Sequence, residues 1–355
     1  MLASALTKRD GQTVLETRRY PDPEVGPGKA LLEIRAAALN HLDLYSRAHH
    51  AADPSAADKI IGADAAGVIR EVGPGVEDLA PGNEVVLNPG LSCGHCELCE
   101  AGEESECPGF DLVGRGVPGT YAELIVVPAA NLAPKPTHLS FEEAAALPLA
   151  HLTAWRMAMT RGGLQPGERV LIHGIGGGVA LAALQIAKLA GAEVIVTSSA
   201  DTKLERAREA GADETINYKN TPEVAKAVRE MTGNKGVDLV IDTVGAATLP
   251  ASVSAARNGG RVVVCGATTG ADATINIREV FWRQITILGS TMGSTDDFRE
   301  MLVTVAERGL VPVIDSVRHL SDAGAALDHM ETGDQFGKIV LSASSDAGSW
   351  PEPVE

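Results

Sequence analysis

The stretch that most constrains the fold lies at residues 169–196, RVLIHGIGGGVALAALQIAKLAGAEVIV. Its pattern predicts a short apolar strand, a glycine-rich turn, a helix of small and aliphatic residues, and a second apolar strand. Gly174, Gly176, Gly177 and Gly178 lie in the turn and lead directly into the helix. The first N–H groups of a helix lack intrahelical partners and lie at the positive end of its dipole, so this turn is suited to bind phosphate.

Strand and helix patterns alternate through the chain that follows residue 168. Apolar runs such as VIVTS, VDLVID and RVVVCGA are separated by helical segments such as DTKLERAREAG, which predicts a parallel, doubly wound sheet. Residues 1–130 differ, because short Val-, Ile- and Leu-bearing runs there are bounded by Pro and Gly, which predicts a β-rich domain. The chain is therefore expected to be α/β with two domains. Residues 344–355, SSDAGSWPEPVE, are polar and are expected to form a loose tail.

Composition and charge exclude several classes of partner. Of the 355 residues, 45% are hydrophobic and 22% are charged, as in globular proteins, and 30 Lys and Arg against 47 Asp and Glu give a formal charge of −17. A phosphate backbone would be repelled, and no Lys/Arg cluster reverses the sign locally, so no nucleic-acid partner is expected. No apolar run approaches the ~18 residues of a membrane span. The first residues, MLASALTKRDGQ, lack the apolar core of a secretion signal, so a cytoplasmic location is expected.

Four of the five cysteines lie close together in CGHCELCEAGEESEC, at Cys93, Cys96, Cys99 and Cys107. Thiolates at two-residue gaps are typical of a tetrahedral zinc site. An iron–sulfur cluster is the alternative, because the first gaps and the pair Cys107-Pro108 resemble bacterial ferredoxins, but the last gap has seven residues instead of three. Four sulfurs complete the coordination shell, so one zinc ion is expected to stabilise a lobe at about residues 90–110 without taking part in chemistry. Cys265 ends an apolar strand, and no thiol role is expected for it.

Together these features resemble the medium-chain dehydrogenase/reductase superfamily, which includes zinc alcohol dehydrogenases and quinone oxidoreductases. The resemblance covers nearly all of residues 10–342, and its most specific stretches are AAALNHLDLY, IIGADAAGVIREVGPGV, VVLNPGLSCGHCELC, GTYAELIVVP, HLTAW, GADETINY and FGKIVL. It implies a GroES-like catalytic domain formed by residues 1–150 and 290–343, and a Rossmann domain formed by residues 151–289. It also implies a cleft between the two domains, where a nicotinamide meets a small-molecule substrate.

The sequence departs from the superfamily at the catalytic metal. Zinc alcohol dehydrogenases of this group bind a second zinc ion through a Cys, a His and a Cys, and the matching positions here are Asn40, Ala63 and Leu149. These side chains cannot replace two thiolates and an imidazole. A hydrogen-bonded cleft without metal is therefore the favoured interpretation.

Several polar side chains near these positions are candidates for contacts within such a cleft. An unconventional metal site would have to use His41, Asp43 and Asp64, or His49 and His50, and neither set follows a known metal-binding spacing. The candidates for contact with substrate or nicotinamide are Asn40 and Thr153. The candidates for a proton relay, or for orienting that network, are Tyr45, Asp64, His41 and Asp43. For each of these residues the alternative is a structural hydrogen bond.

The missing ligands have a chemical consequence. Catalytic zinc polarises a carbonyl or stabilises an alkoxide, which contributes several kcal/mol. Without it, oxidation of an unactivated alcohol is difficult, whereas reduction of an electron-poor acceptor is not. We therefore expect hydride transfer from a nicotinamide to a quinone or an α,β-unsaturated carbonyl, with a proton from water or a cleft residue. Two alternatives stay open: an alcohol or polyol dehydrogenase that uses NAD(P) with an unconventional metal site, and a non-catalytic nucleotide-binding protein.

The glycine turn fits the superfamily's variant of the dinucleotide-binding fingerprint, a GxxGxxA pattern that starts at Gly174. The following strand ends in VIVTSS, with no Asp or Glu to accept the ribose 2′-OH of NAD. In NADPH-dependent quinone oxidoreductases a small residue, a lysine and a tyrosine surround the 2′-phosphate, and Ser198, Lys203 and Tyr218 match them. The alternatives are a solvated lysine and a strand-end aromatic residue. NADP is therefore expected, with NAD as the alternative.

The resemblance also implies further cofactor contacts and an oligomer. Asp201 is expected to cap the helix that follows Ser198, and its carboxylate would weaken the preference for NADP if it turned inward. The loops implied to contact the cofactor contain Val179, Val244, Gly266, Ala267 and Ser290. Lys338, from the far end of the chain, is implied to contact it as well, and a surface lysine is the alternative. Residues 285–290, ITILGS, are predicted to form an edge strand through which subunits pair, so a homodimer or homotetramer is expected.

Overall fold

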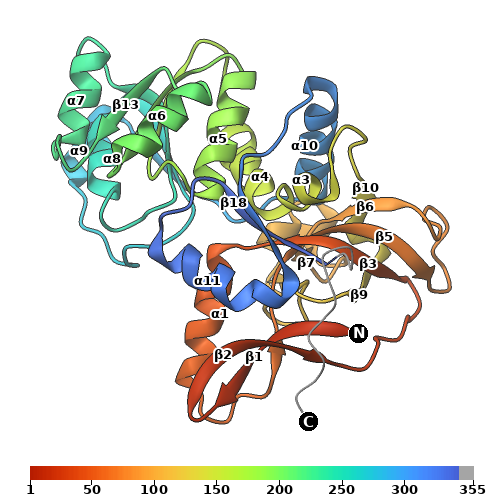
Figure 1. Cartoon of the computed structure of the whole chain (residues 1–355). Helices are drawn as coiled ribbons and strands as arrows, with labels where there is room; N and C mark the ends of the chain where they lie inside the picture. The colour runs from red at the N-terminus through yellow and green to blue at the C-terminus, as the bar shows by residue number, and fades with distance from the viewer. Residues whose placement is uncertain (344–355) are drawn as a thin grey trace. The chain divides into compact units, whose positions relative to one another are not determined.

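Figure 1 shows the computed structural model, which describes residues 1–343. The chain divides into two compact units. Of the described residues, unit 1 contains Met1–Cys99, Cys107–Leu149 and residues 314–343, and unit 2 contains Glu100–Glu106 and Ala150–Val313. None of the helices within residues 1–343 has both the length and the apolar character that a membrane crossing requires. The predicted tail, residues 344–355, lies outside the described residues.

The later boundary between the units falls at Ile314, whereas the sequence suggested residue 290. The difference arises because helix α10 (Thr295–Arg308) is bonded to other parts of unit 2. Asp297 in its first turn accepts hydrogen bonds from Arg156, at 2.9 Å, and from the Thr160 hydroxyl. These contacts tie residues 290–313 to unit 2.

Unit 1 is built mainly from β-strands. Its main sheet has seven strands in the order β10-β6-β5-β3-β18-β17, with β9 also paired to β3. Their bounds are β3 Lys29–Ala38, β5 Asp64–Val72, β6 Glu84–Leu87, β9 Leu124–Pro128, β10 Leu132–Pro134, β17 Ile314–His319 and β18 Lys338–Ser342. The other strands form a sheet of order β2-β1-β4 and the pair β7-β8, with bounds β1 Leu2–Arg9, β2 Gln12–Arg19, β4 Lys59–Ile60, β7 Gly90–Leu91 and β8 Asp111–Leu112. The helices of this unit are α1 His41–Ala52, α3 Phe141–Ala145 and α11 Ala323–Thr332.

Strand β3 organises the main sheet, because it pairs with β5, β9 and β18. Its sequence KALLEIRAAA has apolar residues at seven of ten positions, and these are the buried ones, whereas Lys29, Glu33 and Arg35 keep some exposure. The register aligns Ala38 of β3 with Asp64 of β5 and with Val340 of β18. Figure 1 shows the blue strand β18 joining the red strands of this unit. Both ends of the chain therefore form one domain, as the GroES-like fold requires.

Unit 2 contains a six-stranded, wholly parallel sheet in the order β13-β12-β11-β14-β15-β16. The strands are β11 Arg169–Ile172, β12 Glu193–Ser198, β13 Glu214–Asn217, β14 Val237–Asp242, β15 Ala256–Val264 and β16 Thr286–Gly289. The helices are α5 Gly178–Leu189, α6 Asp201–Glu209, α7 Val224–Met231, α8 Leu249–Ala255, α9 Ile277–Arg283 and α10, and α4 Pro148–Trp155 leads into the unit. This strand order is that of a Rossmann fold, with the order reversing between β11 and β14. The predicted fold class is confirmed.

Candidate functional site

The four clustered cysteines of unit 1 lie around a common centre. The segment folds back through α2 (Glu97–Glu100) and the short helix η1 (Glu104–Glu106), so that all four Sγ atoms lie within 4.8 Å of one another. Neighbouring sulfur atoms are 3.5, 3.6, 3.8 and 3.9 Å apart. A tetrahedral zinc ion with Zn–S bonds of about 2.3 Å needs sulfurs about 3.8 Å apart. Cys93, Cys96, Cys99 and Cys107 therefore fit the single structural zinc ion expected of them.

Backbone groups also favour thiolates in this cluster. The N–H of Gly109 donates to the Cys107 sulfur at 3.3 Å. The backbone N–H of His95, with further hydrogen bonds from Cys96 and Cys107, lowers the pKa of Cys93 to about 6, below the ordinary value of 9.0, whereas burial and the neighbouring sulfurs raise the pKa of Cys96 to about 11. Since the thiolate is the form that binds metal, these donors prepare the loop for an ion.

A second polar cluster lies where β3, β5 and β18 are paired. Asp64, the first residue of β5, is fully buried, and its carboxylate accepts three hydrogen bonds. The donors are Asn40 Nδ2 at 2.9 Å, the Leu149 backbone N–H at 2.8 Å and Lys338 Nζ at 2.9 Å. The strand register brings Asn40 and Lys338 to this carboxylate from distant parts of the sequence, and Leu149 reaches it from helix α4.

This cluster brings together the three positions at which the resemblance implies a catalytic zinc. Asn40 and Leu149 both donate to Asp64, and Ala63 directly precedes it. A carboxamide and two alkyl side chains provide neither thiolate nor imidazole, so a catalytic zinc does not fit these residues. Within residues 1–343, the four-cysteine cluster is the only group of three or more His, Cys, Asp or Glu side chains placed to hold a metal ion.

The Lys338 ammonium is buried in the same cluster and has all its donors in use. Its three hydrogen bonds go to Leu39 O at 2.7 Å, to Asn40 Oδ1 at 2.6 Å and to Asp64 Oδ2 at 2.9 Å. An ammonium has three N–H groups and no more. The acceptors all belong to unit 1, whereas the resemblance implied a cofactor contact for Lys338; that contact stays a prediction.

Tyr121 completes the polar cluster and was missed by the sequence reasoning. Its hydroxyl donates to Asp43 Oδ2 at 2.7 Å, and the same oxygen accepts the Asn40 backbone N–H at 2.8 Å. Both side chains are fully buried, and burial raises the pKa of Asp43 to about 6. The only sequence signal for Tyr121 was its place in GTYAELIVVP, one of the stretches that resemble the superfamily.

Stability is expected to fall as Asp43 ionises. Its folded-state pKa of about 6 lies above the ordinary value of 3.8, so the folded protein binds this proton more tightly than the unfolded chain does. The stabilisation is fully present below about pH 4 and is lost as the pH rises through 6, by at most about 3 kcal/mol. Urea unfolding across this range should show a flatter pH dependence for Asp43→Asn than for wild type. The exposed control Asp334→Asn should keep the wild-type slope, and equal slopes for all three proteins would contradict the assignment.

The other predicted catalytic residues lie outside this hydrogen-bonded cluster. Tyr45 is 45% exposed on α1, with its ring edge-on to His41 at a centroid distance of 5.8 Å. Burial of part of the ring lowers the pKa of His41. Thr153 is buried on α4, where its hydroxyl lies 3.7 Å from the Met292 sulfur. Asn40 and Asp64 are therefore hydrogen-bonded to each other, whereas Tyr45 and Thr153 do not belong to their cluster.

The glycine turn has the conformation that its sequence predicts. Gly174 and Gly176 adopt φ angles of +71° and +117°, which side chains other than glycine rarely adopt. Gly177 is the residue before α5, and Gly178 and Val179 begin that helix. The hydroxyl of Thr197, a residue that the sequence reasoning did not single out, accepts the Gly174 N–H at 3.3 Å. The unpaired N–H groups of the first helical turn therefore lie at the carboxyl end of β11, where a dinucleotide phosphate binds in this fold.

The residues expected near a 2′-phosphate lie at the end of the adjacent strand. Ser198 is the last residue of β12, and its carbonyl accepts the Tyr218 N–H at 3.0 Å. Lys203 lies in the first turn of α6. Asp201 was expected to cap α6, but it is the first helical residue, after Ala200, and its carboxylate accepts Asn217 Nδ2 at 2.6 Å. The capping prediction is wrong, because the carboxylate bonds to the neighbouring strand instead of the helix N–H groups.

The loops at the carboxyl ends of β14, β15 and β16 contain an unsatisfied polar atom. The Ser290 hydroxyl is buried and has no hydrogen-bond partner among the described residues. It lines a cavity of about 270 Å³ together with Val264, Gly289 and Thr291. Asp242 fixes the neighbouring loop by accepting the N–H groups of Val244 and Gly245, each at 3.0 Å. A buried hydroxyl without a partner at this edge of the sheet fits a bound cofactor, and the same edge contains Gly266 and Ala267.

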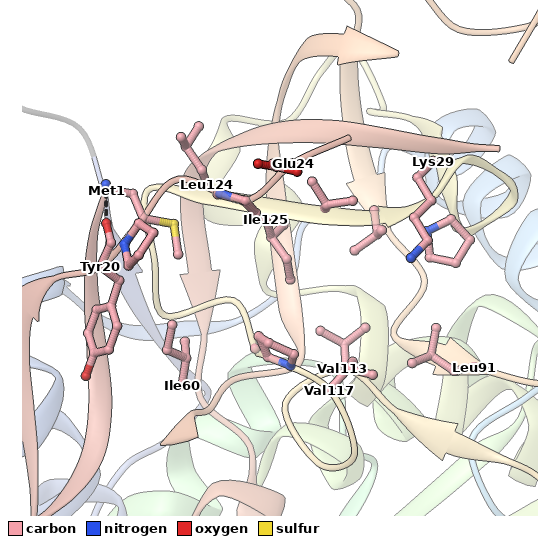
Figure 2. A pocket seen from close by; sticks show the side chains of 17 residues that line it. Met1, Tyr20, Glu24, Lys29, Ile60, Leu91, Val113, Val117, Leu124 and Ile125 are labelled. Carbon is pink, nitrogen blue, oxygen red and sulfur yellow. Dashed lines mark hydrogen bonds between the residues drawn. The ribbon is translucent and has the colours of Figure 1, made fainter. Parts of the chain in front are cut away.

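Unit 1 also has a cavity of about 530 Å³ that is lined mainly by apolar side chains (Figure 2). Figure 2 shows Ile60, Val113, Val117, Leu124 and Ile125 around it. None of the predicted catalytic, cofactor-binding or metal-binding residues lines this cavity. It is therefore separate from the polar cluster around Asp64.

Comparison with known proteins agrees with this architecture. Residues 26–137 match the alcohol dehydrogenase GroES-like domain, and residues 178–307 match the zinc-binding dehydrogenase family. A zinc-type alcohol dehydrogenase-like protein of Schizosaccharomyces pombe is 34% identical, over 92% of this chain and 94% of its own length. A crotonyl-CoA reductase of Streptomyces avermitilis is 30% identical, over 97% of this chain and 85% of its own. A crystal structure of an NAD-dependent alcohol dehydrogenase is 47% identical, with a TM-score of 0.91 over 97% of this chain and 100% of that one.

The fold and the comparisons with known proteins thus agree. The structure has a GroES-like unit formed by both chain ends and a Rossmann unit with a glycine turn. The relatives are named a zinc-type alcohol dehydrogenase-like protein, a crotonyl-CoA reductase and an NAD-dependent alcohol dehydrogenase, and the match covers at least 85% of each. The chain is a nicotinamide-dependent oxidoreductase that belongs to the medium-chain dehydrogenase/reductase superfamily.

Proposed function

We propose that this protein uses NADPH to reduce a quinone or an α,β-unsaturated carbonyl compound without a catalytic metal. The observation that carries the proposal is the convergence of Asn40, Ala63 and Leu149 at Asp64. At the place where a zinc ion would polarise an alcohol or a carbonyl, the chain provides a closed set of hydrogen bonds. An acceptor that is already electron-poor needs no Lewis acid, and an unactivated alcohol does.

Each unit by itself offers groups suited to this chemistry. A bound nicotinamide supplies the hydride. In unit 2, the first N–H groups of α5 would hold the pyrophosphate, and the unpartnered Ser290 hydroxyl offers a donor and an acceptor to the bound group. In unit 1, the cluster around Asp64 provides fixed dipoles that need no reorganisation during reaction.

The names of the relatives support two different assignments, a reductase and an alcohol dehydrogenase. The crotonyl-CoA reductase of Streptomyces avermitilis is by its name a reductase of an α,β-unsaturated thioester, which agrees with the proposed class of α,β-unsaturated carbonyl acceptors. The 47% identical structure is named an NAD-dependent alcohol dehydrogenase, which favours the second candidate, an NAD-linked alcohol dehydrogenase. The chain's missing metal ligands favour the first.

A stopped-flow panel separates these candidates. NADPH and NADH oxidation would be followed with quinones and enones, and NADP⁺ and NAD⁺ reduction with alcohols, on protein of measured zinc content. We expect turnover of a quinone or enone class with NADPH, and alcohol oxidation at least about 100-fold slower, because several kcal/mol of metal stabilisation are absent. Faster turnover of alcohols would favour the second candidate. Tight NADPH binding without any turnover would support a non-catalytic nucleotide-binding protein.

The preference for NADP is a separate proposal, supported by Ser198, Lys203 and Tyr218 at the end of β12. Ser198→Asp combined with Lys203→Ala should weaken NADPH binding by about 10- to 100-fold, since a charge-assisted hydrogen bond contributes ~1.5–3 kcal/mol. NADH binding should strengthen, because the new carboxylate accepts the ribose 2′-OH. The exposed control Lys226→Ala on α7 should leave both dissociation constants unchanged. Unaltered selectivity in the double variant would remove the 2′-phosphate assignment.

We also propose that copies of the chain pair through the β16 edge of the Rossmann sheet. β16 is the last strand of that sheet, and the neighbouring helix α9 exposes Phe281 (62%) and Trp282 (75%). An open strand edge beside exposed apolar side chains is a pairing surface. Trp282→Asp should convert the oligomer to monomers in sedimentation or light-scattering measurements. Val303→Asp, on an exposed apolar position of α10, should not, and an unchanged mass for Trp282→Asp would exclude this surface.

A further inference from the structure

We propose that Lys338 is a positioning residue of the reductase site, whose buried ammonium holds the Asn40 carboxamide and the Asp64 carboxylate at the place where the superfamily resemblance implies a catalytic zinc. The inference rests on the proposed reductase function, because a positioning residue needs a reaction in which to act. Its test uses measurements that do not depend on which acceptor is reduced.

The ammonium supplies the positive charge that Asp64 requires. Asp64 is fully buried, and a buried carboxylate without a countercharge is strongly unfavourable. Within residues 1–343, the ion pair with Lys338 at 2.9 Å is the only one recorded for Asp64. A single cation of the chain therefore balances this carboxylate, with no need for an added ion.

The ammonium also determines which way the Asn40 carboxamide faces. Lys338 Nζ can only donate, so the atom 2.6 Å from it must be the amide oxygen. The amide nitrogen then faces Asp64 Oδ2, at 2.9 Å, where it donates. The opposite orientation would place an NH₂ group against an ammonium and a carbonyl against a carboxylate. Without Lys338, the hydrogen bond to the Asn40 amide oxygen is lost.

Removal of the ammonium should uncouple turnover from cofactor binding. In Lys338→Met, turnover of the best acceptor should fall about 100-fold, the scale of a misplaced catalytic environment. The NADPH dissociation constant should stay within about twofold of wild type, because every Lys338 donor is used inside unit 1. Asp64→Asn in the Lys338→Met background should restore thermal stability lost in the single variant, since the unpaired buried charge is removed.

Lys135 provides a matched control in the same unit. Its ammonium is similarly buried and bonds to Leu139 O at 2.6 Å and to Glu84 at 3.2 Å, away from the Asp64 cluster. Lys135→Met should lower thermal stability without changing turnover. Lys338→Arg should retain the charge but lose part of the turnover, because a planar guanidinium cannot replace a compact ammonium among three acceptors.

Three results would overturn the inference. One is an NADPH dissociation constant raised about tenfold or more in Lys338→Met with turnover per bound cofactor unchanged, which would make Lys338 a cofactor ligand. Another is unchanged turnover in Lys338→Met. The third is a double variant with Asp64→Asn that is no more stable than Lys338→Met alone. An enone panel without turnover would instead refute the proposed function, and the binding and stability measurements would still test the pairing of Lys338 with Asp64.

Discussion

Replacement of Cys107 by serine is expected to release the zinc ion and to unfold the cysteine-rich lobe. Cys107 is the buried member of the four-sulfur cluster, and its sulfur also accepts the Gly109 N–H. Structural zinc contributes an apparent ~10–16 kcal/mol in peptide sites, and loss of about a third of this would lower the melting temperature by roughly 4–7 °C in a protein of this size. The expected zinc content falls from one ion per chain to near zero.

Calorimetry and metal analysis of the same samples test this prediction. Cys265→Ala is the matched control, because Cys265 lies in unit 2, outside the cluster, and burial raises the pKa of its thiol to about 11. This variant should keep its zinc and lose little stability. A Cys107→Ser protein that retains zinc and the wild-type melting temperature would show that the four sulfurs do not form a structural metal site.

Arg156→Met is expected to destabilise the protein by about 3–5 kcal/mol. The Arg156 side chain is buried and pairs with Asp297 at 2.9 Å, with Glu106 at 3.2 Å and with Glu103. Asp297 is buried as well, so removing the guanidinium leaves its carboxylate without a countercharge. Urea unfolding would measure the loss.

Two control variants identify the cause of the stability loss in Arg156→Met. Asp297→Asn should recover part of the stability in the Arg156→Met background. Arg299→Met, which removes an exposed pair with Asp296, should cost no more than about 1 kcal/mol. A loss of similar size in Arg156→Met and Arg299→Met would contradict the buried-charge explanation.

These two predictions are linked through the segment between Cys99 and Cys107. That segment contains Glu103 and Glu106, two of the three carboxylates that pair with Arg156. A zinc ion fixes both ends of the segment, so its loss should release the two glutamates. The combined variant Cys107→Ser/Arg156→Met is therefore expected to be less destabilised than the sum of its parts.

Local patterns in the sequence predicted those parts of the fold that local chemistry determines. The glycine turn and the parallel sheet follow from strand–helix alternation and from glycines with positive φ angles. The four cysteines follow from short spacing, because a single loop brings all four sulfurs together. The residues of the glycine turn and of the cysteine cluster are close in sequence.

The polar cluster around Asp64 could not be predicted from local sequence patterns. Asn40, Asp64 and Lys338 meet because β3 pairs with both β5 and β18 in a particular register, and Leu149 reaches Asp64 from helix α4. Sequence reasoning selected Asn40 and Asp64 separately, assigned Lys338 to the cofactor and did not select Tyr121. The prediction that Asp201 caps α6 was wrong for a similar reason, because its partner Asn217 lies on the neighbouring strand β13.

The central claim, hydride transfer without a catalytic metal, is tested most directly by counting zinc ions in protein whose turnover is measured on the same sample. The account predicts one zinc ion per chain, with full turnover of an enone or quinone by NADPH and no increase when zinc is added. Two ions per chain, with turnover lost when the second is selectively removed, would contradict it.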